Sequence, residues 1–115
     1  MLTFNELQAV HARILAVAGK IDARTMTDFE SGIRAALDAG HVNLVLDFSE
    51  VPFISSAGLG VLMSFIEEVR GNGGDLHLAR VQTEVFRIFD MLDFTTLFQF
   101  FDSVEAAVEA FAPPA

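Results

Sequence analysis

The chain has 115 residues, the size of one ordinary domain with a single hydrophobic core. Its formal net charge of −9, with only seven Lys and Arg residues, argues against a nucleic-acid ligand, because binding to a phosphate backbone depends on cationic side chains. The absence of cysteine excludes a disulfide framework and a thiolate metal site, and no apolar run approaches the roughly 20 residues that span a bilayer. We therefore expect a cytoplasmic protein, without direct membrane insertion, that binds a basic protein partner.

The first half of the chain predicts two strands, a helix and a third strand. The strands are expected within residues 2–7, at Arg13–Asp22 and at His41–Phe48. Thr25 followed by Asp28 predicts a helix start, and apolar residues then recur at helical spacing until Gly40. The strand His41–Phe48 is almost continuously apolar, which is typical of a central strand in a parallel sheet.

The second half predicts three helices and two strands. Beyond Phe53–Met63, apolar residues keep helical spacing as far as Val69, and the run Gly71–Gly74 then ends the helix. The next elements are a strand at Asp75–Arg80, a helix at Gln82–Leu92, a strand at Leu97–Phe101 and a helix through Phe111. Asp102 and Glu105 resemble a capping box that opens the last helix.

This alternation of strands and helices predicts an α/β domain. Such domains have a mostly parallel or mixed sheet, here of about five strands with about four helices, joined by right-handed crossovers. No internal repeat, low-complexity tract or linker divides the chain. We therefore predict one domain over residues 1–111 and a short flexible tail over residues 112–115.

The segment Phe53–Met63, FISSAGLGVLM, places two serines where the central strand gives way to a helix. Open α/β sheets usually carry function at this edge. A serine here is either an N-cap of the helix or an acceptor of phosphate, because free N–H groups and the helix dipole stabilise an anion. Gly58 and Gly60 either keep the approach to the serines open or allow close packing of the helix.

The sequence contains no recognisable catalytic machinery. Neither serine lies in the G-x-S-x-G pattern of a nucleophile elbow, and no phosphate-binding glycine loop is present. The histidines His11, His41 and His77 are scattered and are expected at the surface or at strand edges. We therefore predict a protein that is not an enzyme and has no cofactor or metal.

Four segments together resemble the STAS domain family, in particular the bacterial anti-sigma factor antagonists. Leu44–Met63, LVLDFSEVPFISSAGLGVLM, resembles the family's central signature. AGKID at Ala18–Asp22 is similar to its G-E-L-D turn, GNGGDLHLAR at Gly71–Arg80 to its G-G-x-L turn and strand, and VFRIFDMLDFTTLFQFF at Val85–Phe101 to its V-x-R-L-F-D helix and last strand. The resemblance covers nearly the whole chain and implies a sheet flanked by helices, built as a right-handed β-α superhelix.

The resemblance also implies a partner switch in transcription regulation, such as a stress response. The unphosphorylated antagonist binds an anti-sigma factor that is a serine kinase of the histidine-kinase-like ATPase fold, and the sigma factor is released. The kinase phosphorylates the antagonist and ends the interaction, and a metal-dependent serine phosphatase restores it. The family's phosphorylated residue corresponds to Ser56, and Asp22 matches its turn aspartate. Ser55 occupies the family's acidic position and is a competing acceptor.

The expected partner-binding residues are Asp22, Ser55, Ser56, Ala57, Gly58, Leu59, Val61 and Phe65. Val61 and Phe65 lie beside the main apolar stripe of their helix, so they belong either to a wide core-facing surface or to an exposed apolar contact near Ser56. A C-terminal set of phenylalanines is expected in the core rather than in an aromatic ligand pocket, namely Phe94, Phe98, Phe100 and Phe101.

Two other functions stay open at this point. The same motif occurs in STAS subunits that regulate or scaffold an assembly, such as a lipid or anion transporter, without being phosphorylated. A small-ligand sensor or weak hydrolase that uses the cleft at the strand ends belongs to a different class, and the missing base and nucleophile argue against it.

Overall fold

Five strands form one mixed sheet in the computed structural model, which describes residues 2–113. The strands are β1 (Thr3–Gln8), β2 (Arg13–Ala18), β3 (Asn43–Glu50), β4 (Asp75–Ala79) and β5 (Gln99–Phe101), and they lie in the sheet in chain order. β1 is antiparallel to β2, and all other neighbours are parallel. The helices are α1 (Met26–Asp38), α2 (Ser56–Gly71), α3 (Thr83–Met91) and α4 (Val104–Glu109). The expected α/β class, with five strands and four helices, is confirmed.

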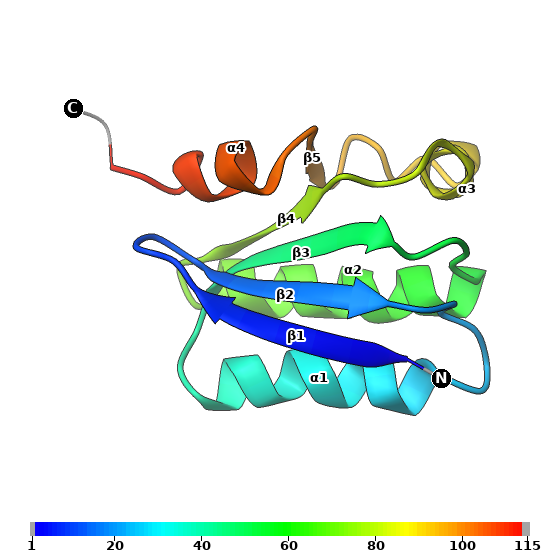
Figure 1. The fold of residues 1–115 in the computed structure, drawn as a ribbon, viewed down its shortest axis with the longest axis horizontal. Helices are drawn as coiled ribbons and strands as arrows, with labels where there is room; N and C mark the ends of the chain where they lie inside the picture. Colours follow the sequence, from blue (N-terminus) through cyan, green and yellow to red (C-terminus); the bar gives the residue numbers. More distant parts are fainter. Residues whose placement is uncertain (1, 114–115) are drawn as a thin grey trace.

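Helices cover both faces of the sheet, and they do so unequally. α1 and α2 lie on one face and α4 on the other (Figure 1). The larger core lies between the sheet and α1, α2 and α3, and it includes the fully buried Phe29, Phe48 and Phe89. On the other face, Ala107 of α4 packs with Val45 in a smaller core. β3 is therefore buried on both faces, which explains its continuous apolar sequence.

His77 of β4 anchors α4 to the sheet. The residue is 2 % exposed, and its ring stacks on Phe111 with centroids 3.8 Å apart and lies 4.9 Å from the ring of Phe101. Its Nδ1 lies 2.9 Å from the carbonyl oxygen of Ala107, and because a carbonyl only accepts, Nδ1 donates. The expectation that His77 lies at the surface or a strand edge is therefore wrong, because α4 and its flanking phenylalanines cover it.

Most element boundaries agree with the expected ones within two or three residues. β5 begins two residues later than expected, because Leu97 is held in a turn where its N–H donates to the carbonyl of Phe94 at 3.2 Å. The capping box of Asp102 and Glu105 is wrong: Ser103 is the N-cap of α4, and its Oγ accepts the N–H of Ala106 at 3.0 Å. The last helix ends at Glu109, and the expected tail, 112–115, lies partly outside the described residues.

Candidate functional site

The loop that follows β2 and the loop that follows β3 are joined by backbone hydrogen bonds. Ile21 and Ile54 form an isolated parallel bridge, the N–H of Ile21 donates to the carbonyl of Phe53 at 2.9 Å, and the N–H of Ser55 donates to the carbonyl of Ile21 at 2.8 Å. The hydroxyl of Thr25, the residue before α1, donates to the carbonyl of Lys20 at 2.6 Å and fixes the first loop internally. The β2–α1 loop therefore lies directly beside the serine segment.

The two serines have different surroundings. Ser55 is the N-cap of α2, with extended backbone angles (φ −79°, ψ 164°), and its Oγ accepts the N–H of Gly58 at 3.1 Å. Ser56 is the first residue of α2 and is exposed, and within residues 2–113 its hydroxyl takes part in no hydrogen bond. Ser55 therefore has a structural role in starting the helix, and the hydroxyl of Ser56 is free for chemistry.

The two glycines also differ. A Cβ on Gly58 would lie 2.8 Å from Cγ1 of Ile54 and 2.9 Å from Cγ2 of Ile21, whereas a Cβ on Gly60 would meet nothing within 4 Å. Gly58 therefore allows α2 to approach the joined loops closely. Gly60 is exposed and leaves the surface of the helix flat beside Ser56.

Five of the expected partner-binding residues are at least partly exposed. Ser56 and Ala57 are exposed, and Asp22, Ser55 and Val61 are half-buried. One carboxylate oxygen of Asp22 accepts the N–H of Arg24 at 2.9 Å, so Asp22 shapes the turn of the β2–α1 loop. Asp22 and the two serines therefore lie at the same edge of the sheet, where the bridge of Ile21 and Ile54 joins their segments.

Three of the expected partner-binding residues are buried and present no exposed side chain to a partner. Gly58 lies under the joined loops, Leu59 is 0 % exposed and Phe65 is 3 % exposed. The ring of Phe65 is covered by the guanidinium of Arg34, whose carbon lies 5.1 Å from the ring centroid, and Glu68 holds that guanidinium through two bonds of 2.7 and 2.8 Å. The wide apolar surface of α2 is therefore explained by its contacts with both the sheet and α1.

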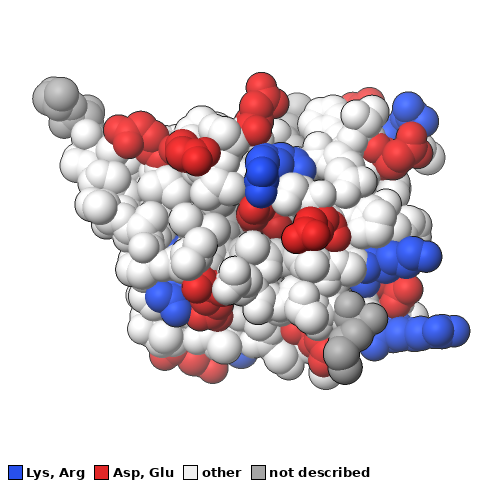
Figure 2. All heavy atoms as spheres, in the orientation of Figure 1, with Lys and Arg blue, Asp and Glu red and all other residues white. Residues whose placement is uncertain are grey.

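Two cations beside the serines were missed from the sequence. Among residues 2–113, Lys20 and Arg24 are the cationic side chains that form no ion pair, whereas every other one lies 3.9 Å or less from a carboxylate. Together with Asp22 and Asp28 they line a cavity of about 560 Å³. Figure 2 shows basic side chains that project from the side of the molecule where β2 and β3 end. One signal was available, because Lys20 stands where the G-E-L-D turn has Glu.

An ion pair fixes the neighbouring end of β4. Nε and Nη2 of Arg80 lie 3.2 and 2.8 Å from the two carboxylate oxygens of Asp47, and Nη2 also donates to Oγ of Ser49 at 3.1 Å. Burial raises the pKa of Asp47, but the hydrogen bonds from Arg80 and from the backbone N–H of Ser49 outweigh it and hold that pKa below its usual value. Arg80 keeps this geometry with a φ of +56°, in the left-handed region.

The described part of the chain offers no metal centre and no membrane span. Within residues 2–113, no three His, Asp or Glu side chains gather in the way that a metal ion requires. The helices in the same range are too short or too polar to cross a bilayer.

Comparison with known proteins identifies related sequences. Residues 5–107 match the model of the STAS domain. The chain is 31 % identical over 98 residues to BtrV of Bordetella bronchiseptica, a protein named as a candidate anti-sigma factor antagonist, and the match covers 85 % of this chain and 84 % of BtrV. It is 29 % identical over 75 residues to the anti-sigma-B factor antagonist of Listeria monocytogenes, covering 65 % of this chain and 66 % of that protein.

Solved structures share the fold. An anti-sigma factor antagonist from Mycobacterium paratuberculosis has a TM-score of 0.86 at 22 % identity, covering 96 % of this chain and 94 % of that one. The antagonist SpoIIAA in its unphosphorylated form has a TM-score of 0.78 at 16 % identity, covering 94 % and 95 %. The phosphorylated form of SpoIIAA from Bacillus has a TM-score of 0.72 at 15 % identity, covering 96 % and 100 %.

Proposed function

The chain belongs to the STAS domain family, and from that premise we propose that it is an anti-sigma factor antagonist controlled by phosphorylation of Ser56. The unphosphorylated chain binds an anti-sigma factor that is a serine kinase of the histidine-kinase-like ATPase fold. Phosphorylation of Ser56 ends this binding, and a serine phosphatase reverses it. The chain itself performs no catalysis and acts on transcription through its partner.

One observation carries the proposal: the two adjacent serines are used differently. The hydroxyl of Ser55 is partly buried and accepts the N–H of Gly58, so it is occupied by the helix cap. The hydroxyl of Ser56 is exposed one residue later, at the start of the 16-residue helix α2. A kinase can reach Ser56 without unfolding the helix, and this supports Ser56 over Ser55 as the acceptor.

A phosphate at this position changes the local electrostatics strongly. It adds about −1.5 to −2 charges and three strong acceptor oxygens. The free N–H groups and the positive dipole end of α2 stabilise it, and the unpaired cations Lys20 and Arg24 project from the adjoining loop. The modification therefore adds negative charge to the surface beside Ser56, and a partner selected for the unmodified surface loses affinity without any rearrangement of the fold.

The proposed contact surface for the partner consists of exposed residues around Ser56. It includes Ser56, Ala57 and the flat surface at Gly60, together with the ring of Phe53, which is 41 % exposed. Lys20 belongs to its charged margin. The buried Leu59 and Phe65 act only by holding α2 in place.

The test compares the two serines as a matched pair. The protein is isolated from its native cells under resting and stressed conditions and mapped by intact mass and phosphopeptide analysis. We expect a signal-dependent phosphate on Ser56 that Ser56→Ala abolishes. Ser55→Ala should keep the phosphate on Ser56, and its free energy of unfolding should fall by about 1 kcal/mol because the N-cap of α2 is lost. Ser56→Asp is expected to bind the co-purifying kinase more weakly than Ser56→Ala.

Three results would contradict this proposal. A phosphate confined to Ser55 would reverse the assignment of the two serines. No phosphate under any condition, with complete coverage of Phe53–Met63 and a membrane complex as the co-purifying partner, would favour a scaffold subunit. Equal binding of the kinase by Ser56→Ala and Ser56→Asp would mean that charge at this position does not control the interaction.

A further inference from the structure

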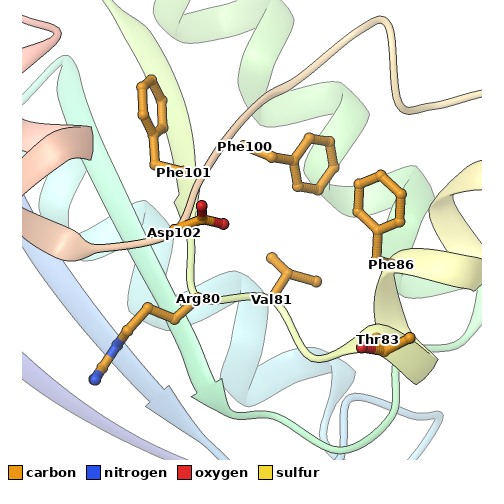
Figure 3. A pocket seen from close by; sticks show the side chains of 7 residues that line it. All are labelled: Arg80, Val81, Thr83, Phe86, Phe100, Phe101 and Asp102. Atoms are coloured by element: carbon orange, nitrogen blue, oxygen red, sulfur yellow. The ribbon is translucent and has the colours of Figure 1, made fainter.

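A second cavity lies between the end of β4, the start of α3 and β5. Its volume is about 440 Å³, and its lining residues are Arg80, Val81, Thr83, Phe86, Phe100, Phe101 and Asp102 (Figure 3). None of these residues belongs to the serine segment or to the β2–α1 loop, so the proposed phosphorylation switch makes no use of the cavity.

Two phenylalanine rings form an open aromatic wall. The ring centroids of Phe86 and Phe100 lie 5.0 Å apart with the planes at 76°, and Phe100 is itself held by Phe89 of the core at 5.2 Å. Phe86 is 39 % exposed, so part of its ring is open to solvent. In Figure 3 both rings and the side chain of Val81 face the hollow, whereas the side chain of Arg80 points away from the rings.

Among the described residues, the cavity offers one carboxylate without a partner, that of Asp102. Within residues 2–113, the carboxylate of Asp102 takes part in no hydrogen bond and no ion pair, because Ser103 rather than Asp102 caps α4. The guanidinium of Arg80 is already held by Asp47. Figure 3 shows the Asp102 carboxylate at the margin of the cavity, across from the aromatic rings.

The surroundings of the cavity are negative. The pKa of Arg80 is raised, first by its hydrogen bond to Asp47 and then by that carboxylate's charge, and Glu105 and Glu50 add to the effect. Asp47 therefore neutralises the one cation that lines the cavity, and Asp102 is the one carboxylate in the lining. The whole chain carries a net charge of −9, which favours approach of a basic surface.

We propose that this cavity binds an arginine side chain of a protein partner. A guanidinium is planar, stays charged, stacks on aromatic rings and bonds to a carboxylate through two parallel N–H groups. Phe86 and Phe100 supply the aromatic surface, Asp102 supplies the carboxylate, and the hydroxyl of Thr83 is a further acceptor. The cavity is open to solvent, so a side chain enters it while its backbone stays outside, as in a protein contact.

The test uses a defined probe on the unphosphorylated full-length protein. Amide shifts of the ¹⁵N-labelled protein are followed by NMR during titration with acetyl-Gly-Arg-Gly-amide. Two control peptides replace the arginine by lysine or by citrulline, which is its neutral isostere. We expect weak, saturable binding of the arginine peptide, with the largest shifts at Val81, Thr83, Phe86 and Asp102, much weaker binding of the lysine peptide and none of the citrulline peptide. Asp102→Asn and Phe86→Leu should each weaken binding roughly two- to fivefold.

The controls separate this proposal from the switch. Asp38→Asn removes the same charge from α1 and should leave the affinity unchanged, and Ser56→Ala should bind the peptide like the wild type. Equal binding of arginine, lysine and citrulline peptides, or wild-type affinity in Asp102→Asn, would overturn the proposal and leave the role of Ser56 untouched. Conversely, if Ser56 is not phosphorylated in cells, the binding of the arginine peptide to the cavity is not affected.

Discussion

Alanine substitutions at Gly58 and Gly60 should differ in their effect on stability. Both glycines lie in α2, and their φ angles are not in the left-handed region, so the backbone accepts alanine at each. In a helix, alanine is favoured over glycine by about 1 kcal/mol. At Gly60 the added Cβ meets nothing within 4 Å, so Gly60→Ala should raise the free energy of unfolding by about that amount.

At Gly58 the same gain is opposed by a steric clash. The added Cβ would lie 2.8 Å from Cγ1 of Ile54 and 2.9 Å from Cγ2 of Ile21, and both isoleucines are fully buried. Overpacking of a core costs about 1–3 kcal/mol. Gly58→Ala should therefore be neutral to destabilising by about 2 kcal/mol, which leaves it about 1–3 kcal/mol below Gly60→Ala.

Urea unfolding and thermal melting of the two variants measure this difference. For a chain of this size, 1 kcal/mol corresponds to roughly 4 °C in Tm, so the two melting temperatures should differ by about 4–12 °C. The reasoning fails if Gly58→Ala is as stable as Gly60→Ala. That result would mean that the joined loops move away from α2 at little cost and that close packing does not explain this glycine.

Two further predictions concern the charged and the buried residues. The pKa of Asp47 lies below its unfolded value of about 3.9, so its contribution to stability is complete above that pH and is lost as the pH falls through the folded pKa. In Asp47→Asn the free energy of unfolding should therefore fall less steeply below about pH 4 than in the wild type, whereas the exposed control Glu67→Gln should behave like the wild type. An unchanged pH dependence in Asp47→Asn would argue against a stabilising ion pair with Arg80. Phe65→Glu should lower stability by more than about 3 kcal/mol, because the ring is buried under Arg34; an unchanged Tm with lost partner binding would return Phe65 to the contact surface.

The fold could be predicted because its signals are local. The unbroken apolar run of β3 reflects burial on both faces of the sheet. Gly40 and Gly73 end α1 and α2 with φ of +93° and +86°, a conformation that other residues adopt rarely, so these breaks were visible in the sequence. The position of Ser56 at the start of α2 followed from the same strand-to-helix pattern.

The errors at the site come from contacts between residues far apart in the chain. Phe65 is covered by Arg34, whose own partner Glu68 is 34 residues away, and no local pattern predicts such a pair. The lack of an ion pair at Lys20 and Arg24 depends on the whole fold, because it is defined by the pairing of the other cations. Asp102 and Ser103 are both good N-caps, and the backbone angles at Ser103, φ −142° and ψ 155°, decide between them.

The sheet order has a consequence for how the protein is made. Because the strands lie in chain order, no later strand has to be inserted between two earlier ones, and each new β-α unit can join the open edge as it leaves the ribosome. The face covered by α4 is the exception. Its apolar residues, Val45 among them, stay uncovered until the last residues of the domain are synthesised and Ala107 reaches His77. Closure of the second core therefore depends on the six-residue helix α4, and a chain that stalls just before it leaves that core open to chaperones and proteases.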